Sequence, residues 1–216
     1  MNTAKIIAIT NPLIENLTTE DFIAYTARVS NPSNQMNTET SAKLLKYCIK
    51  NKHFSIFEMV NAVMEIETTR DIGRQILRHR SFSFQEFSQR YSDPTKNLGF
   101  VGREARLQDP KNRQNSIETD DDNLSIKWDD KQTELIEHAS ELYNWAIQNG
   151  IAKEQARAVL PEGLTVSRMY MNGTLRSWIH YCELRMEAGT QKEHRLVAEA
   201  AWRELAKYFS FLAENK

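Results

Sequence analysis

Apolar and polar positions follow two periods along this chain of 216 residues, one typical of strands and one typical of helices. Short alternating or continuously apolar runs predict β-strands at 5–10, 60–68, 98–107 and 164–171. Apolar residues spaced three and four apart predict amphipathic helices at 20–29, 40–50, 70–77, 130–149, 153–159, 174–185 and 192–212. This mixture, without an internal repeat or a Pro/Gly-rich linker, predicts one α+β domain over residues 1–216.

Several residues mark where these helices begin and end. Thr19 is suited to cap the first helix, and Gly150 is suited to end the helix at 130–149. Pro161 stops the short helix before it, because the residue preceding a proline disfavours the helical conformation. The polar segment 109–122 is expected to be a solvated loop. The apolar stripe of the helix at 130–149 is predicted to face inward through Leu135, Ile136, Ala139, Leu142, Tyr143 and Ala146.

The composition is that of an ordinary soluble globular protein, with 40% hydrophobic and 26% charged residues. Lys and Arg number 28 against 29 Asp and Glu, so the net charge is −1 and argues against a polynucleotide-binding surface. The apolar run at 6–9 is far too short to span a membrane, and no signal-peptide layout precedes it. The two cysteines suit a reducing compartment, and the five histidines form no zinc-binding pattern. We therefore expect a cytoplasmic protein with no metal, no membrane and no nucleic-acid partner.

The most informative segment is 78–91, where cationic, hydroxyl, carboxylate and aromatic side chains follow one another closely. Three side chains at the end of the predicted helix are close enough in sequence to project to one side: Gln75, Arg78 and His79. If the following chain is extended, a carboxylate, a hydroxyl and a guanidinium share one edge: Glu86, Ser88 and Arg90. Phe82, Phe84 and Tyr91 are expected to anchor in the core. Guanidinium forks match phosphate oxygens, so the segment predicts a site for a small phosphorylated ligand.

The segment resembles the signature of the flavin-dependent thymidylate synthases, Arg-His-Arg-x-x-Ser-x-Asn-x-x-Ser-x-Arg. The signature positions are occupied here by Arg78, His79, Arg80, Ser83, Gln85, Ser88 and Arg90, with a glutamine in place of the asparagine. Further blocks of this chain are similar to the family in order and spacing: 53–58, 156–161, 173–180 and 184–185. The resemblance extends over residues 5–211.

The resemblance implies a fold and an activity. The fold is an α+β domain with a central antiparallel-rich sheet flanked by helices. The activity is the reductive methylation of dUMP to dTMP without a cysteine nucleophile. Methylenetetrahydrofolate would supply the carbon, FAD would carry the hydride, and NADPH would be the reductant. Family members are homotetramers with sites shared between subunits, and symmetric closed assemblies are common among soluble proteins.

The resemblance also implies roles for individual residues. Arg185 is the candidate for catalysis, because a fixed guanidinium beside the uracil ring would stabilise negative charge on it. The dUMP-binding residues would be Gln75, Arg78, Glu86, Ser88, Gln89, Arg90, Arg157 and Arg185. The FAD-binding residues would be Ser55, Arg78, His79, Arg80, Glu86, Thr174, Arg176 and His180.

Two other interpretations of the Arg78-His79-Arg80 cluster follow from the residues alone. The three side chains would complement the negative end of their helix dipole, as an isolated triplet of this kind usually does. They would also serve a non-catalytic nucleotide- or RNA-binding module. Such a module binds polynucleotides with a steep salt dependence and holds no flavin.

Overall fold

A four-stranded antiparallel sheet forms the centre of the computed structural model, which describes residues 2–213. Met171 in the third strand pairs with Met64 on one side and with Phe84 on the other. The sheet confirms the predicted α+β class with a central antiparallel sheet. In spatial order its strands are β1 (Thr3–Ile9), β2 (Asn61–Thr69), β6 (Val166–Thr174) and β3 (Ser83–Glu86).

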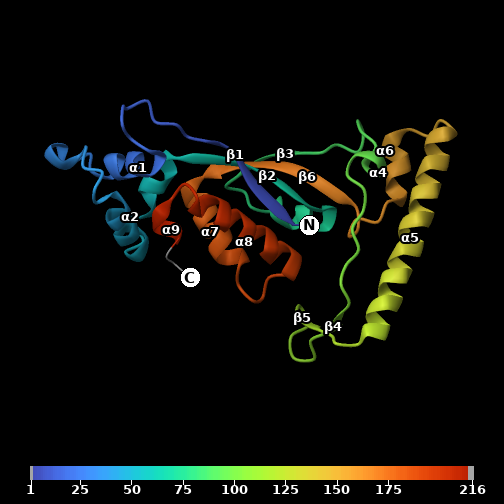
Figure 1. Ribbon diagram of the computed structural model, residues 1–216. Coiled ribbons are helices and arrows are strands. Elements are labelled where there is room, and N and C mark those ends of the chain that lie inside the picture. Colours follow the sequence, from blue (N-terminus) through green and yellow to red (C-terminus); the bar gives the residue numbers. More distant parts are fainter. Residues whose placement is uncertain (1, 214–216) are drawn as a thin grey trace.

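One face of this sheet is apolar because its strands bury every second residue. In β2, Ala62, Met64 and Ile66 are buried while the residues between them are more exposed. A strand period of two places these three side chains on the same face. Helices α7 (Leu175–Arg185) and α8 (Lys192–Ala206) lie against the sheet and contribute to the same hydrophobic core (Figure 1).

The remaining helices gather at the two ends of the sheet (Figure 1). One end is formed by α1 (Thr19–Ala27), α2 (Ser41–Lys50), α9 (Ser210–Ala213) and the 3-10 turns η1 (Pro32–Asn34) and η2 (Phe54–Met59). The other end is formed by α4 (Pro94–Asn97), α5 (Asp122–Gln148), α6 (Lys153–Ala156) and the 3-10 turn η3 (Arg157–Val159). The short α3 (Arg70–Ile76) follows β2 directly and leads into the motif segment.

The long helix α5 differs from its prediction in length and in burial. It begins at Asp122 because the Asp121 side chain accepts a hydrogen bond from the backbone N–H of Leu124 and so caps the first turn. The predicted inward stripe is only partly correct. Leu135 and Leu142 are 49% and 39% exposed. The buried members of the stripe include Tyr143 and Ala146, which pack on Ala156 in a small second core.

Four further features differ from the sequence pattern. The predicted strand at 98–107 is only partly correct: Phe100 forms an isolated bridge with Thr165, and a regular strand begins only at Arg106. The polar segment 109–122 is not wholly a loop, because β5 (Ser116–Glu118) pairs with β4 (Arg106–Gln108) in a separate ribbon. The predicted helix 192–212 is divided into α8 and α9. Thr18, and not Thr19, caps α1 in a capping box with Asp21.

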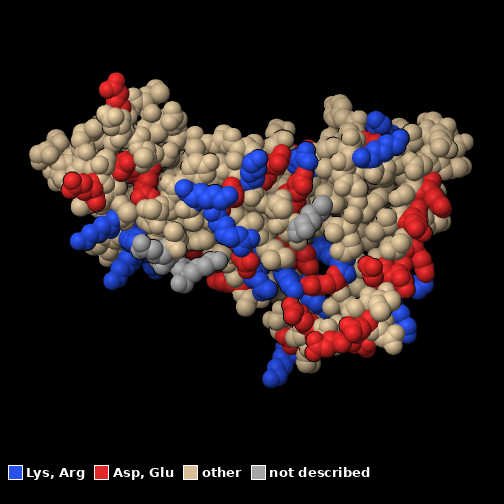
Figure 2. Space-filling view, viewed as in Figure 1, with Lys and Arg blue, Asp and Glu red and all other residues tan. Residues whose placement is uncertain are grey.

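The surface carries both signs of charge. On the face drawn in Figure 2, basic and acidic side chains are interspersed and do not form a continuous basic stripe. Of the helices formed by residues 2–213, none combines the length and the apolar character that a membrane crossing requires.

Candidate functional site

The motif loop between α3 and β3 is held by an aromatic anchor. The loop turns through backbone hydrogen bonds from His79 to Ile76 and from Phe82 to His79. Phe82 is buried and meets the Trp178 ring edge-on, with ring centroids 4.8 Å apart. Its ring lies directly over Gly173 of β6, at a position where a Cβ atom would be 2.4 Å away. The absence of a side chain at this glycine therefore allows the loop to dock on the sheet.

Docking of Phe82 leaves two guanidinium groups at the surface. Arg78 and Arg80 are both exposed. Neither side chain forms a hydrogen bond or an ion pair with another of residues 2–213. Unpaired guanidinium groups two residues apart are suited to bind an anionic ligand such as a phosphate.

His79 points the other way and contacts the predicted catalytic arginine. The Nε of Arg185 donates a hydrogen bond to the Nε2 of His79 across 2.9 Å. Burial, together with the charges of Arg185 and Arg78, lowers the pKa of His79 to about 4. His79 is therefore neutral at pH 7 and accepts from the guanidinium, whose orientation it fixes. Its ring also meets Tyr181 edge-on at 4.9 Å.

Gln75, a predicted dUMP residue, belongs to the same group through a histidine to which the sequence pattern assigned no role. His194 of α8 is fully buried, and its ring lies between Gln75 and Tyr181. Its Nδ1 is 3.2 Å from the Oε1 of Gln75, and its Nε2 is 3.2 Å from the Tyr181 hydroxyl. Only the apolar spacing around position 194 in α8 signalled that this histidine would be buried.

Glu86 lies at the end of β3 in a separate cluster of charged side chains. Its Oε1 accepts a 2.9 Å hydrogen bond from the Ser167 hydroxyl. Arg70 and Arg74 form ion pairs with its two carboxylate oxygens at 3.6 and 3.4 Å. Arg157 lies close enough for its charge to help lower the pKa of Arg70, after the larger effect of burial. Glu86 is thus held by cations that an incoming ligand would have to share.

The expected shared edge of Glu86, Ser88 and Arg90 is wrong. β3 ends at Glu86, and the chain then turns with the backbone N–H of Tyr91 bonded to the carbonyl of Ser88. Arg90 reaches α6, where it pairs with Glu154 at 3.1 Å. Tyr91 is 86% exposed and anchors nothing in the core.

Gln89, in the same turn, carries a polar atom without a partner. The side chain is only 3% exposed, and its Nε2 has no hydrogen-bond partner among the described residues. Buried polar groups are normally satisfied, so this amide is an exception within the turn. Its position between Ser88 and Arg90 places it within the predicted dUMP segment.

The remaining predicted flavin residues share one face of α7 and η2. Thr174 caps α7, with its hydroxyl accepting from the backbone N–H of Ser177 at 3.2 Å. Arg176 forms an ion pair with Glu58 of η2. His180 packs edge-on against Phe54 with ring centroids 4.5 Å apart. Ser55 is exposed on the same 3-10 turn, so this turn and α7 bring together residues far apart in sequence.

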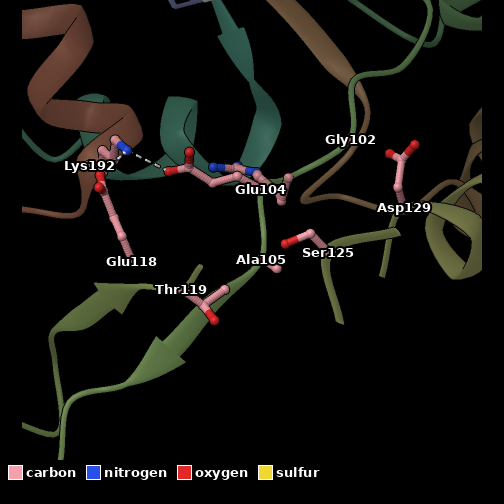
Figure 3. A pocket seen from close by; sticks show the side chains of 9 residues that line it. Gly102, Glu104, Ala105, Glu118, Thr119, Ser125, Asp129 and Lys192 are labelled. Carbon is pink, nitrogen blue, oxygen red and sulfur yellow. Dashed lines mark hydrogen bonds and ion pairs between the residues drawn. The ribbon is translucent and has the colours of Figure 1, made fainter. Parts of the chain in front are cut away.

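The main cavities lie away from these groups. A cavity of about 590 Å³ opens between the β4–β5 ribbon, α5 and the start of α8 (Figure 3). Its wall includes Lys192, whose Nζ pairs with Glu104 at 2.8 Å and Glu118 at 2.7 Å. Five cavities on residues 2–213, of which this is one, have walls that contain none of the predicted dUMP or flavin residues. Nor do the described side chains form a cluster able to hold a metal ion.

Comparison with known proteins adds independent information. The sequence model of the family described as thymidylate synthase complementing protein matches residues 12–209. A probable flavin-dependent thymidylate synthase of Paramecium bursaria Chlorella virus 1 is 49% identical over 212 residues, covering 98% of this chain and 97% of the relative. The flavin-dependent thymidylate synthase of Synechocystis sp. is 49% identical over 213 residues, covering 97% and 96%.

A solved structure also matches along the whole length. The UMP/dUMP methylase PolB from Streptomyces cacaoi, bound with 5-Br dUMP, superposes with a TM-score of 0.80 at 25% identity. The match covers 99% of this chain and 93% of PolB. The fold is therefore shared with a pyrimidine-nucleotide methylase. The chain itself belongs to the thymidylate synthase complementing protein family, in agreement with the resemblance of its motif to flavin-dependent thymidylate synthases.

Proposed function

We propose that this chain is a flavin-dependent thymidylate synthase that converts dUMP to dTMP. The observation that carries the proposal is the hydrogen bond between Arg185 and a neutral His79, beside the unpaired guanidinium groups of Arg78 and Arg80. One oriented cation and two free ones suit a ligand with a polarisable ring and a phosphate. Full-length identity of 49% to proteins named for this activity supports the same function.

The residues around Arg185 would bind and polarise dUMP. A guanidinium fixed against the uracil would stabilise negative charge on the ring and so favour attack by the ring carbon that is methylated. The dUMP contacts are assigned to Gln75, Arg78, Glu86, Ser88, Gln89, Arg90, Arg157 and Arg185. Arg90 would exchange its exposed ion pair with Glu154 for the phosphate, and exposed pairs of this kind are weak.

FAD would be held by the exposed cations and by the α7–η2 face. The contacts are assigned to Ser55, Arg78, His79, Arg80, Glu86, Thr174, Arg176 and His180. When bound, FAD would supply the hydride transfer, with NADPH as its reductant and methylenetetrahydrofolate as the carbon donor. The fit is supported by the two unpaired guanidinium groups, which suit a diphosphate.

A cysteine nucleophile has no place in this proposal. Cys48 and Cys182 are both buried, and burial raises the pKa of each thiol. A thiol is nucleophilic mainly as the thiolate, so neither side chain is suited to attack a substrate. The chemistry would therefore depend on the cofactor and on charged side chains.

We also propose that the enzyme is a cytoplasmic homotetramer whose sites are shared between subunits. The predicted residues form open surface groups in one chain, which a neighbouring chain would enclose. The exposed apolar side chains along α5, including Leu135, Leu142 and Trp145, offer a surface for such a contact. Molar mass measured by light scattering would test the assembly.

The visible absorption spectrum of the purified protein tests the function. FAD is added first and dUMP second, at the native oligomeric state. A bound flavin spectrum that shifts on addition of dUMP, followed by dTMP formation with the two co-substrates, is the expected result. Absence of flavin uptake by folded protein would overturn the proposal. Salt-dependent binding of polynucleotides without flavin would instead support a nucleic-acid-binding module.

A further inference from the structure

A continuous hydrogen-bond chain runs from the start of α8 into the core beneath the proposed nucleotide site. It begins at Glu193, to whose Oε2 the Nε2 of Gln191 donates at 2.9 Å. The Oε1 of Gln191 accepts from the Nε2 of Gln75 at 2.8 Å. His194 and Tyr181 complete the chain at 3.2 Å on either side of the histidine ring. The chain joins α8, α3 and α7, which are distant in sequence.

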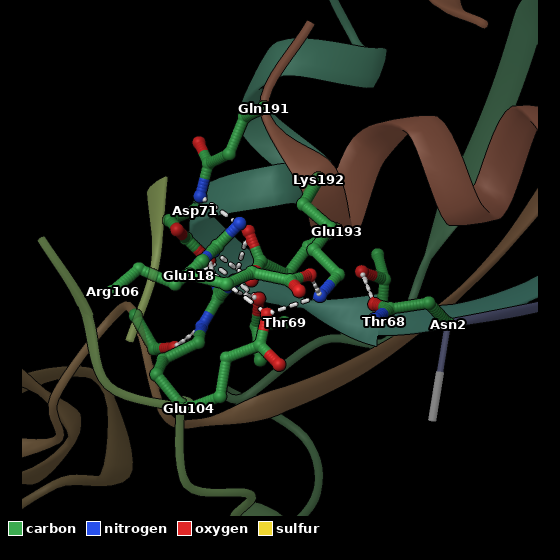
Figure 4. A network of polar contacts seen from close by, with 12 residues as sticks. Asn2, Thr68, Thr69, Asp71, Glu104, Arg106, Glu118, Gln191, Lys192 and Glu193 are labelled. Carbon is green, nitrogen blue, oxygen red and sulfur yellow. Dashed lines mark hydrogen bonds and ion pairs between the residues drawn. The ribbon is translucent and has the colours of Figure 1, made fainter. Parts of the chain in front are cut away.

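The carboxylate of Glu193 is held in its ionised form. Burial acts to raise its pKa, but hydrogen bonds from Arg106, its own backbone N–H and Gln191, with the charge of Arg103, lower the pKa to about 2. Arg103 lies 3.0 Å from its Oε2, and Arg106 bonds its Oε1. Figure 4 shows Gln191, Arg106 and Glu193 converging within the wider polar network. An ionised carboxylate only accepts hydrogen bonds, so this end of the chain has a fixed polarity.

That polarity determines every donor that follows. Gln191 must turn its N–H₂ group toward Glu193, and its oxygen therefore faces Gln75. Gln75 must in turn present its N–H₂ group to Gln191 and its oxygen to His194. The Nδ1 of His194 must then carry the proton, and its Nε2 accepts from the Tyr181 hydroxyl. Exchanging the amide oxygen and nitrogen of either Gln191 or Gln75 would bring two acceptors together. Only one set of donors and acceptors is therefore consistent along the chain.

One amide hydrogen of Gln75 is unpaired in this arrangement. Its oxygen is engaged by His194, and one of its two amide hydrogens is engaged by Gln191. The second amide hydrogen has no partner among residues 2–213. Gln75 is partly exposed, so this hydrogen is available to a ligand. The group that Gln75 offers is therefore a donor, which matches a carbonyl or hydroxyl oxygen of a nucleotide.

We propose that His194 is a positioning residue for nucleotide binding, which fixes the Gln75 carboxamide so that its free N–H faces an acceptor oxygen of dUMP. The inference depends on the proposed function, because it takes dUMP as the ligand. His194 touches Gln75 and the core but is buried behind them, so it acts through Gln75. Without the histidine the Gln75 oxygen loses its donor, and the carboxamide is free to rotate.

The test is a double-mutant cycle between His194→Ala and Gln75→Ala in flavin-loaded protein. The dissociation constant of dUMP is measured from the flavin absorbance change for wild type, both single variants and the double variant. A carboxamide that can rotate no longer holds its N–H toward dUMP, and loss of one such hydrogen bond corresponds to about a tenfold change in affinity, so we expect His194→Ala to weaken dUMP binding roughly tenfold. In the Gln75→Ala background the same change should have no further effect. Flavin uptake should be unchanged in all four proteins.

Two further variants separate positioning from general damage. His194→Asn keeps an N–H donor near the position of Nδ1 and should recover most of the affinity lost in His194→Ala. His138→Ala removes an exposed histidine of α5 and should bind dUMP like wild type. Equal losses from His194→Ala in the wild-type and Gln75→Ala backgrounds would refute the inference, as would no loss at all. If His194→Ala does not fold, the cycle is run with His194→Asn and His194→Gln, where equal affinities contradict the proposal. Failure of the wild-type protein to bind dUMP would instead refute the proposed function.

Discussion

Replacing Gly173 with alanine tests whether packing beneath the motif loop holds its cationic side chains in place. Phe82 ends the loop and is only 9% exposed. An alanine Cβ at position 173 would lie 2.4 and 2.5 Å from two carbons of its ring. The ring would have to retreat by about 1 Å to reach the ordinary carbon–carbon contact distance of about 3.5 Å.

The space for that movement is small. Trp178 and Tyr181 both contact Phe82 edge-on, with ring centroids 4.8 and 6.0 Å away, and both are buried. Overpacking of a filled core typically costs about 1–3 kcal/mol. For a chain of this size, a loss of about 2 kcal/mol lowers the melting temperature by roughly 4–8 °C. Because Phe82 anchors the loop, its displacement should also shift Arg78 and His79 and weaken dUMP binding.

The assay is thermal unfolding together with the dUMP-induced change in the flavin spectrum. Gly189→Ala is the matched control, since no atom lies within 4 Å of the Cβ it would carry. Both substitutions reduce the entropy of the unfolded chain alike, so the difference between them isolates the clash. A melting temperature for Gly173→Ala within about 1 °C of Gly189→Ala would show that the reasoning about Phe82 is wrong.

The remaining predictions concern charge. Arg185→Ala should lower turnover by about 100-fold or more while leaving the melting temperature near that of wild type, and near-normal turnover would reject its catalytic role. Arg90→Ala should weaken dUMP binding about tenfold with little effect on flavin uptake, and an unchanged dissociation constant for dUMP would count against a phosphate contact. The pKa values of His79 and His194 are lowered to about 4 and about 3, so the unfolded chain binds more protons and stability should fall as pH drops below about 6.5. Urea unfolding at pH 7 and pH 5 should show a smaller loss for His194→Asn than for wild type, and equal losses would contradict this pKa argument.

Local sequence determined the regular elements wherever one face had to be apolar. The alternation in 60–68 predicted β2 because a strand turns every second side chain toward the same face. The apolar stripe at 40–50 predicted α2 in the same way. The glycine after 149 predicted the end of α5, and Gly150 has the left-handed φ of 78° that suits a glycine at a helix end. The start of α5 was missed because its first apolar residues, Leu124, Ile126 and Trp128, are spaced two apart and are exposed, so they show no helical period. The ribbon β4–β5 was missed because short exposed strands leave no apolar alternation.

The candidate site also has one part that the sequence predicted and one part that it did not. The motif itself is contiguous, so the sequence alone was enough to predict the cationic loop at 78–80 and an anionic ligand for it. The partners of that loop were not visible, since Arg185 bonds His79 across 106 positions and His194 meets Gln75 across 119. Burial, hydrogen-bond direction and the lowered pKa values depend on which helices pack together, and no local period encodes that. The sequence by itself determined the chemical groups available; only the tertiary structure decided which of them touch, because distant segments meet only when the core forms.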